Sequence, residues 1–166
     1  MKKKVLWIED GVTFDAQKFV GPVIHSRKYD LTTVITISDA IRKIQKEEFD
    51  IIIFDIRMQP GDIPEWEKLY QDMKQPALRR ERLGLILLYC FLRPDLEKEI
   101  ELNEKYSWVK PGMIGIFSVE KEEELSEHMQ KWGITFYRNK NAKTPITTLL
   151  KLIDEIVGKG IENNLK

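Results

Sequence analysis

The sequence lacks several features that would mark a specialised class of protein. Among its 166 residues there is one cysteine, Cys90, so the chain cannot form an intrachain disulfide. Its 27 basic and 27 acidic residues cancel, which leaves no excess charge to favour nucleic acid or an anionic membrane. The longest apolar run, Leu83–Leu92, falls well short of the roughly 20 residues that span a bilayer. These absences predict a soluble, cytoplasmic protein that recognises charged ligands locally.

The length and the two ends of the chain set the expected organisation. A chain of 166 residues suits one domain with a sizeable core. We expect a single domain over residues 1–158, followed by a polar tail over residues 159–166. The N-terminal stretch MKKKVLWIED enters a strand-like run directly and carries no signal-peptide core. No DNA-binding module is expected after the last helix.

Short runs rich in β-branched and aromatic residues alternate with segments of helical period. Five of these runs are predicted strands: Lys4–Ile8, Leu31–Ile37, Ile51–Phe54, Met113–Phe117 and Ile134–Tyr137. The third is apolar at every position, as in a parallel sheet that is covered on both faces. The alternation predicts an α/β fold, a doubly wound five-stranded parallel sheet with helices on both faces.

Local signals predict where the helices begin and end. The expected boundaries are an interruption of Phe14–Ser26 at Gly21-Pro22, an N-cap at Ser38, a helix over Lys121–Trp132 closed by Gly133, and a last helix from Thr144-Pro145 to Gly158. The acidic run Glu120–Glu124 is interpreted as the solvated start of a helix, where negative charge suits the helix dipole.

Polar side chains follow the predicted strands at their carboxyl ends. Glu9 and Asp10 follow the first strand, Asp55 the third, Ser118 the fourth and Lys140 the fifth. In doubly wound sheets ligands bind at this edge, so these groups should converge. Three carboxylates repel one another unless a cation lies among them, and oxygen ligands suit Mg²⁺, which can also bridge to a phosphate. The sequence therefore predicts a site for Mg²⁺ and a phosphoryl group.

These residues, in this order, resemble the receiver domain of bacterial response regulators. In "VLWIED" the pair Glu9-Asp10 resembles the metal-binding acidic pair of that family. In "IIIFDIRM" Asp55 matches the phosphoacceptor, and Arg57 matches the position whose backbone carbonyl binds the metal. The resemblance covers nearly the whole chain and implies a CheY-like, flavodoxin-like sheet with strand order 2-1-3-4-5.

Three later residues extend the resemblance. Ser118 in "IGIFSVE" takes the position of the family hydroxyl, and Lys140 in "FYRNK" takes that of the site lysine. Tyr137 falls on the aromatic switch position. The resemblance implies Mg²⁺-dependent phosphorylation of Asp55 by a sensor histidine kinase or a phosphotransfer protein, which switches the binding of a downstream protein partner. Such a receiver is not a turnover enzyme, and it can form a homodimer.

Some positions depart from the family pattern and leave alternatives open. Val119 follows the hydroxyl where the family has a small residue, and Asn141 follows Lys140 where the family has a proline. A second register would make Lys143 the site lysine. One alternative is a pseudo-receiver, an interaction module that is not phosphorylated. A less favoured one is a Mg²⁺-dependent aspartyl phosphohydrolase, which would carry an aspartate where this chain has Arg57.

The segment between Asp55 and Ser118 is longer than one helical crossover requires. Residues 62–82 are interpreted as an insertion that holds an amphipathic helix, capped by Asp62, and residues 93–112 as an extended crossover after a helix over Leu83–Leu92. Four apolar residues follow helical spacing in the insertion: Trp66, Leu69, Tyr70 and Met73. We expect this helix to cover one side of the site.

Overall fold

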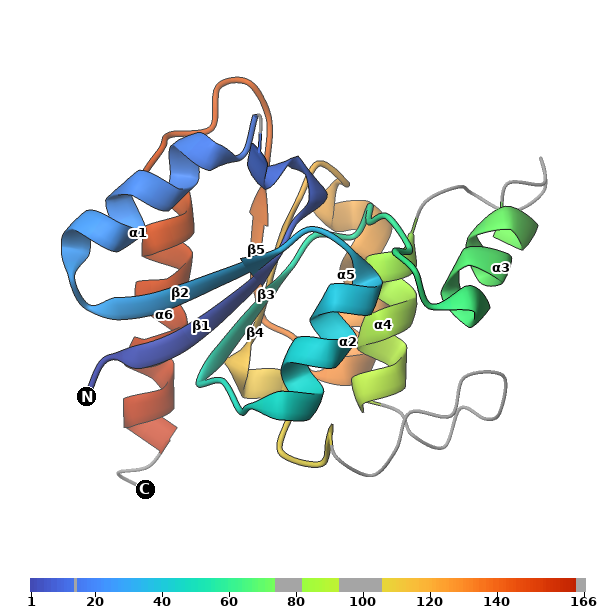
Figure 1. Cartoon of the computed structure of the whole chain (residues 1–166). Coiled ribbons are helices and arrows are strands. Elements are labelled where there is room, and N and C mark those ends of the chain that lie inside the picture. Colours follow the sequence, from blue (N-terminus) through green and yellow to red (C-terminus); the bar gives the residue numbers. More distant parts are fainter. Residues whose placement is uncertain (14, 74–81, 93–105, 164–166) are drawn as a thin grey trace.

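Five parallel strands form the centre of the molecule (Figure 1). The computed structural model describes residues 1–13, 15–73, 82–92 and 106–163. The strands are β1 Lys3–Ile8, β2 Tyr29–Val34, β3 Ile51–Phe54, β4 Ile114–Ser118 and β5 Phe136–Asn139. Their order is β2-β1-β3-β4-β5, and every neighbouring pair is parallel. The predicted fold class and strand order are confirmed.

Helices cover both faces of this sheet (Figure 1). One face carries the 3₁₀ helix η2 Gln17–Phe19, α1 Val20–Ser26 and α6 Thr148–Asn163. The other carries α2 Ile37–Lys46, α4 Leu83–Leu92 and α5 Glu122–Trp132, with α3 Pro64–Met73 beyond α4. Short 3₁₀ helices, η1 Asp10–Thr13 and η4 Pro111–Met113, follow β1 and precede β4. None of the helices among the described residues has the length and apolar content that crossing a membrane would require.

The sheet separates two hydrophobic cores, because side chains alternate between its faces with period two. From the sheet, one core takes Leu6, Ile8, Ile52, Phe54, Ile114 and Ile116, and the other takes Val5, Trp7, Ile51, Ile53 and Phe117. Both sets are fully buried. This explains why β3 is apolar at all of its positions.

Two helix starts differ from the prediction. The N-cap of α2 is Thr36, whose hydroxyl accepts a hydrogen bond from the backbone N–H of Asp39 at 3.1 Å. Ser38, the predicted cap, is buried inside the helix and donates to the carbonyl of Pro60 at 2.7 Å. Gly21-Pro22 does not interrupt α1 but lies in its first turn, where a proline needs no N–H partner. Phe14 lies outside the described residues.

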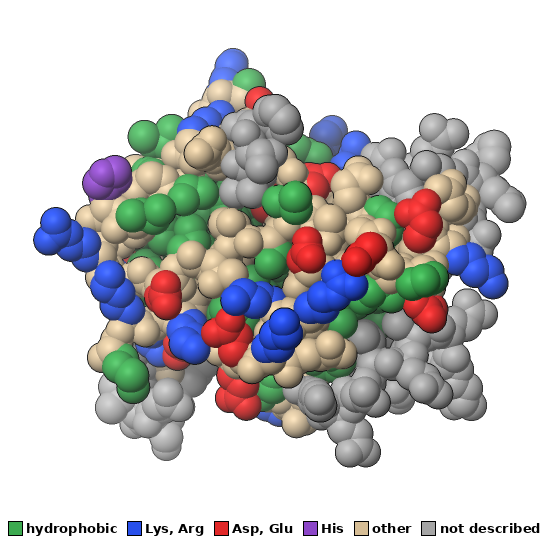
Figure 2. All heavy atoms as spheres, viewed as in Figure 1, with side chains coloured by type: hydrophobic (Ala, Val, Ile, Leu, Met, Phe, Trp, Pro, Cys, Tyr) green, Lys and Arg blue, Asp and Glu red, His purple; other side chains and the backbone are tan. Residues whose placement is uncertain are grey.

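The surface carries both signs of charge side by side. In the view of Figure 2, basic and acidic side chains are interspersed and do not form separate patches. Pairs of this kind include Lys3–Asp50 at 3.2 Å and Lys4–Glu47 at 3.2 Å, near the start of β1. Exposed pairs of this kind contribute little stability.

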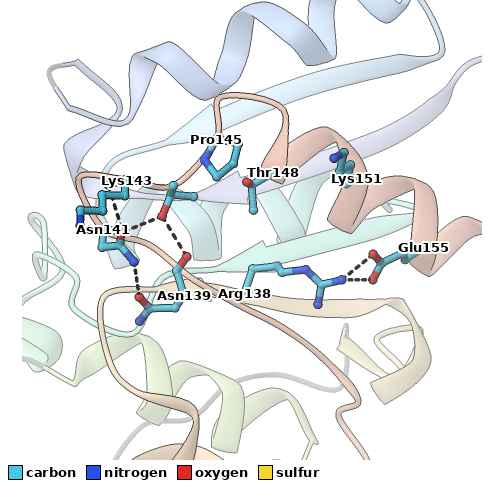
Figure 3. Close-up of a pocket in the computed structure, with 9 residues that line it drawn as sticks. Arg138, Asn139, Asn141, Lys143, Pro145, Thr148, Lys151 and Glu155 are labelled. Carbon is cyan, nitrogen blue, oxygen red and sulfur yellow. Dashed lines mark hydrogen bonds and ion pairs between the residues drawn. The ribbon is translucent and has the colours of Figure 1, made fainter.

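The last helix begins and ends later than predicted. The Thr144 hydroxyl accepts from the backbone N–H of Asn141 at 2.8 Å and donates to the carbonyl of Asn139 at 3.2 Å, which closes a turn. Figure 3 labels Asn139 and Asn141 in this turn. The turn lines a hollow of about 380 Å³ between β5 and α6. At the other end α6 continues through Gly158 to Asn163. A Cβ at Gly158 would meet nothing within 4 Å, so this glycine is on an open helix face and does not end the helix.

The helix expected within residues 62–82 is present as α3, and its Trp66 is 1% exposed and belongs to the same core as α4. The side chains of Leu69, Tyr70 and Met73 lie outside the described part of the chain. Asp62, the expected cap, forms an ion pair with Arg42 of α2 at 2.6 Å. Of the expected crossover over 93–112, the structure describes only residues 106–112.

Candidate functional site

Three carboxylates meet at the carboxyl edge of the sheet. The register pairs Ile8 of β1 with Phe54 of β3, so the residues that follow these two strands are neighbours. The Asp55 backbone N–H donates to the Ile8 carbonyl at 2.9 Å. One carboxylate oxygen each from Glu9, Asp10 and Asp55 lies within 4.8 Å of the others. The sequence-predicted acidic residues are therefore brought together.

Both carboxylate oxygens of Asp55 accept hydrogen bonds, and this residue is only 2% exposed. Its Oδ1 accepts from the Ser118 hydroxyl at 2.6 Å and from the Ile56 backbone N–H at 2.6 Å. Its Oδ2 accepts from the Lys140 ammonium at 2.8 Å. The predicted hydroxyl and lysine thus both contact the predicted phosphoacceptor.

Lys140 links two of the three carboxylates. Its ammonium donates to Glu9 Oε2 as well as to Asp55, and its backbone N–H donates to the Ser118 carbonyl at 2.7 Å. Burial alone would lower the pKa of Lys140, but the charges of Asp55 and Glu9 outweigh it and raise that pKa. Lys143 is exposed and lines the hollow beside α6. The structure places Lys140, not Lys143, at the site.

The acidic cluster has a marked excess of negative charge. Burial, with the Asp55 charge beside it, raises the pKa of Glu9 from 4.5 to about 7 despite the contact with Lys140. The same two causes raise the pKa of Asp10. Three carboxylate oxygens that lie close together, and whose ionisation is made costly by burial and mutual repulsion, suit a small divalent cation that prefers oxygen ligands, such as Mg²⁺. The residues present fit that ion.

The site opens to solvent through a cleft of about 620 Å³. The acidic cluster lies in it, together with Arg57, Val119, Lys140 and Asn141. Val119 is 46% exposed, so it stands at the rim of the cleft. Among the described residues, the cleft lining comes from the strand ends and the segments after them, not from α3. The side chains of Leu69, Tyr70 and Met73 lie outside the described part of the chain, so the cover expected from this helix stays a prediction.

The first turn of α4 packs closely against the backbone of Asp55 and Ile56. The Gly84 N–H donates to the Ile56 carbonyl at 3.0 Å. A Cβ built at Gly84 would lie 1.9 Å from the Asp55 carbonyl oxygen, a distance that no side chain can adopt. The glycine is therefore required for this helix to reach the strand end.

Glu120 was missed by the sequence analysis, which interpreted it as part of a solvated helix start. It is 4% exposed, and its carboxylate binds Arg57 Nε at 2.8 Å and Arg82 Nη2 at 2.8 Å. Burial works against its ionisation, but these two arginines lower its pKa. Its position two residues after the end of β4 could have indicated a place near the site, because ligands of such sheets bind at the carboxyl ends of the strands.

The other two predicted residues lie around this glutamate. The Tyr137 ring is buried, and its hydroxyl donates to the Glu120 backbone carbonyl at 2.6 Å. The backbone N–H of Arg57 points to Asp55 Oδ1 at 3.4 Å, while its side chain pairs with Glu120. Both residues thus contact residues of the site. The role of Tyr137 as a switch and that of the Arg57 carbonyl as a metal ligand remain predictions.

Comparison with known proteins gives a match in structure alone. No family model matches the sequence, and no curated protein matches it. Among solved structures it is similar to the chemotaxis protein CheY4 of Vibrio cholerae, with 19% identity and a TM-score of 0.59 over 94% of this chain and 99% of the other. A CheY-like receiver domain from Methanospirillum hungatei has 18% identity and a TM-score of 0.59 over 98% and 99%.

A third similar structure is the receiver domain of the sensor histidine kinase PA1611 from Pseudomonas aeruginosa. It shares 15% identity with a TM-score of 0.54 over 95% of this chain and 99% of the other, and it holds a magnesium ion in its active-site cleft. All three likenesses are below the identity at which function is transferred. They establish that this chain has a CheY-like receiver fold.

Proposed function

We propose that this chain, which has the receiver fold, is a phosphoacceptor signalling domain whose phosphorylation on Asp55 switches the binding of a partner protein. The observation that carries the proposal is the environment of Asp55. It directly follows a buried strand, faces an open cleft, and is contacted by the hydroxyl of Ser118 and the ammonium of Lys140. A carboxylate so placed can act as a nucleophile toward a phosphoryl group.

The proposed reaction is one phosphoryl transfer. A carboxylate oxygen of Asp55 attacks the phosphorus of a phosphohistidine or an acyl phosphate, and the bond from phosphorus to the donor breaks with its electron pair leaving on the donor. Lys140 exchanges its contact with Glu9 for a phosphoryl oxygen, and the Ser118 hydroxyl donates a hydrogen bond to another phosphoryl oxygen. Mg²⁺, held by Glu9, Asp10, Asp55 and the Arg57 carbonyl, would neutralise the charge that develops.

The receiver fold supports a sensor histidine kinase or a phosphotransfer protein as the source of the phosphoryl group. The magnesium in the similar PA1611 receiver domain supports Mg²⁺ as the ion. Tyr137 is the proposed switch residue, since its hydroxyl donates to the backbone carbonyl of Glu120, two residues after Ser118. We treat the chain as one receiver-like domain that acts by changing its binding partners rather than by turning over an external substrate.

The contacts of Lys140 are also compatible with the pseudo-receiver alternative. Lys140 bridges Glu9 and Asp55, so a side chain of the protein itself supplies a counter-charge to two of the three carboxylates. In a pseudo-receiver these contacts would be the final state, and partner binding would not depend on a phosphoryl group.

The deciding experiment is incubation with acetyl phosphate and Mg²⁺ followed by intact mass spectrometry. The wild type should gain the mass of one phosphoryl group, and the gain should disappear with EDTA and in Asp55→Asn. Asp50→Asn is the matched control, because Asp50 lies at the other end of the same strand, where it pairs with Lys3. A wild type that binds Mg²⁺ yet gains no mass would leave the pseudo-receiver as the function.

A further inference from the structure

Four charged residues form a continuous chain of ion pairs from the cleft to the surface. Arg57 pairs with Glu120 at 2.8 Å, Glu120 with Arg82 at 2.8 Å, and Arg82 with Glu124 at 2.9 Å. We call these four residues the arginine–glutamate chain. Its charges alternate in sign along the chain, from the Arg57 guanidinium to the Glu124 carboxylate.

The arginine–glutamate chain connects three separate elements. Arg57 follows β3, Arg82 lies directly before α4, and Glu124 lies in the first turn of α5. Glu120, between β4 and α5, joins them, and its side chain is only 3% exposed. The two helix starts are therefore tied to one buried carboxylate.

One end of the arginine–glutamate chain lies at the candidate site. Arg57 lines the cleft, and its backbone N–H faces Asp55. The backbone N–H of Glu120 points to the Ser118 hydroxyl at 3.3 Å, and that hydroxyl contacts Asp55. The other end, Glu124, is 40% exposed on α5.

We propose that an anionic group on Asp55 draws Arg57 away from Glu120, that Glu120 then takes Arg82 entirely, and that Glu124 and the start of α5 are thereby released. This deepens the proposed function, on which its phosphorylation step rests, by naming the route from the site to the α4–α5 surface. In this scheme Arg57 binds the anionic group on Asp55, whereas Arg82 is a positioning residue that does not touch the reacting atoms.

The order of these exchanges follows from burial and geometry. The Arg57 side chain is 52% exposed, so it can reorient, and a guanidinium binds phosphoryl oxygens through two parallel hydrogen bonds. Glu120 is buried and cannot give up a counter-charge without replacement. Arg82 is 15% exposed and already in contact, so it supplies that charge. Glu124 can return to water at little cost, because an exposed pair is weak.

The test that needs no phosphorylation uses Arg57→Met, which removes the first guanidinium permanently. Amide hydrogen exchange in the first turns of α5, Glu124–His128, should become about five- to tenfold faster than in the wild type, because local opening becomes easier. Glu124→Gln should produce a similar acceleration. The double variant should exchange no faster than either single variant, because both changes break the same link.

Two controls separate this effect from general destabilisation. The amides of β3 report global unfolding, so the acceleration at α5 must exceed any change there. Arg42→Met removes an arginine that pairs with Asp39 and Asp62, away from the arginine–glutamate chain, and should leave α5 unchanged. An unchanged α5 in Arg57→Met, or effects of Arg57→Met and Glu124→Gln that add in full, would overturn the proposal.

The second arm uses protein treated with acetyl phosphate and Mg²⁺, with occupancy read by intact mass. Phosphorylated wild type should show the same acceleration at α5, and phosphorylated Arg57→Met should show no further change. Phosphorylation with no change at α5 in the wild type refutes the route. If no phosphoryl group is gained, the proposed function fails, while the Arg57→Met exchange data still decide whether the arginine–glutamate chain transmits a change.

Discussion

We expect the replacement of Glu9 to have the largest pH-dependent effect on the free energy of unfolding. It is 1% exposed and lies among two other carboxylates and one ammonium. Glu9→Gln keeps the size of the side chain and resembles the protonated form, but it cannot ionise. Comparing this variant with the wild type at several pH values therefore isolates the cost of the Glu9 charge.

The magnitude follows from the shifted pKa. A rise from 4.5 to about 7 corresponds to about 3 kcal/mol, since one pKa unit is worth about 1.4 kcal/mol. The pKa is raised in the folded state, so between these two values the folded protein holds more protons than the unfolded chain. The free energy of unfolding of the wild type must then fall as pH rises through this window. The free-energy cost of holding the Glu9 charge in the folded protein is absent below pH 4.5 and fully present above pH 7.

The assay is urea unfolding of both proteins in EDTA at pH 5, 6, 7 and 8. We expect the variant to be more stable than the wild type by less than about 1 kcal/mol at pH 5 and by up to about 3 kcal/mol at pH 8. In a domain of this size such a difference is roughly 6–12 °C in Tm. Adding Mg²⁺ at pH 8 should stabilise the wild type more than Glu9→Gln, because the metal binds the native state through the ionised carboxylate.

The reasoning would be refuted by a stability difference that stays constant from pH 5 to pH 8. A variant less stable than the wild type at pH 8 in EDTA would also refute it, since the Glu9 charge would then be favourable without a metal. Ser126→Ala on the exposed face of α5 serves as the control, because its hydroxyl donates to the Glu123 carbonyl of the same helix and does not titrate in this range.

Three further predictions concern other residues. Lys140→Met removes the ammonium from the acidic cluster, so Mg²⁺ should bind about tenfold more tightly, as followed by calorimetric titration, while phosphorylation by acetyl phosphate slows; a weaker Mg²⁺ affinity would contradict this. Gly84→Ala should lower the free energy of unfolding in urea by about 3 kcal/mol, because the added methyl overlaps a backbone carbonyl. Gly112→Ala is the control and should change that free energy little, because nothing lies within 4 Å of its added carbon. Trp66→Ala should cost about 3–5 kcal/mol through the cavity left in the core, and a loss below about 1 kcal/mol in thermal or urea unfolding would show that α3 is not held by this side chain.

Much of the site could be predicted because its residues follow apolar strands. The rule that parallel strands present their carboxyl ends at one edge was enough to bring Asp55, Ser118 and Lys140 together. Glu120 was missed because an acidic run before a helix is also what a solvated helix start contains. Its role depends on Arg57 and Arg82, which are distant in sequence, and no local pattern reports that contact.

The helix boundaries show the same limit. Thr144-Pro145 is a common helix start, but here the threonine hydroxyl is used within the turn that leads from β5 to α6. The choice between capping a helix and closing a turn is made by the position of Asn139 and Asn141, which depends on where β5 ends. Element type followed from the sequence pattern, whereas its first and last residues depended on tertiary contacts.

The separation of the core into two halves by the sheet has a practical consequence for spectroscopy. Trp7 belongs to the half under α1 and α6, while Trp66 and Trp132 belong to the half under α2, α4 and α5. Fluorine-labelled tryptophan would thus place separate NMR probes on the two faces of one sheet. Events at the acidic cluster could be assigned to one face or the other by which resonance shifts.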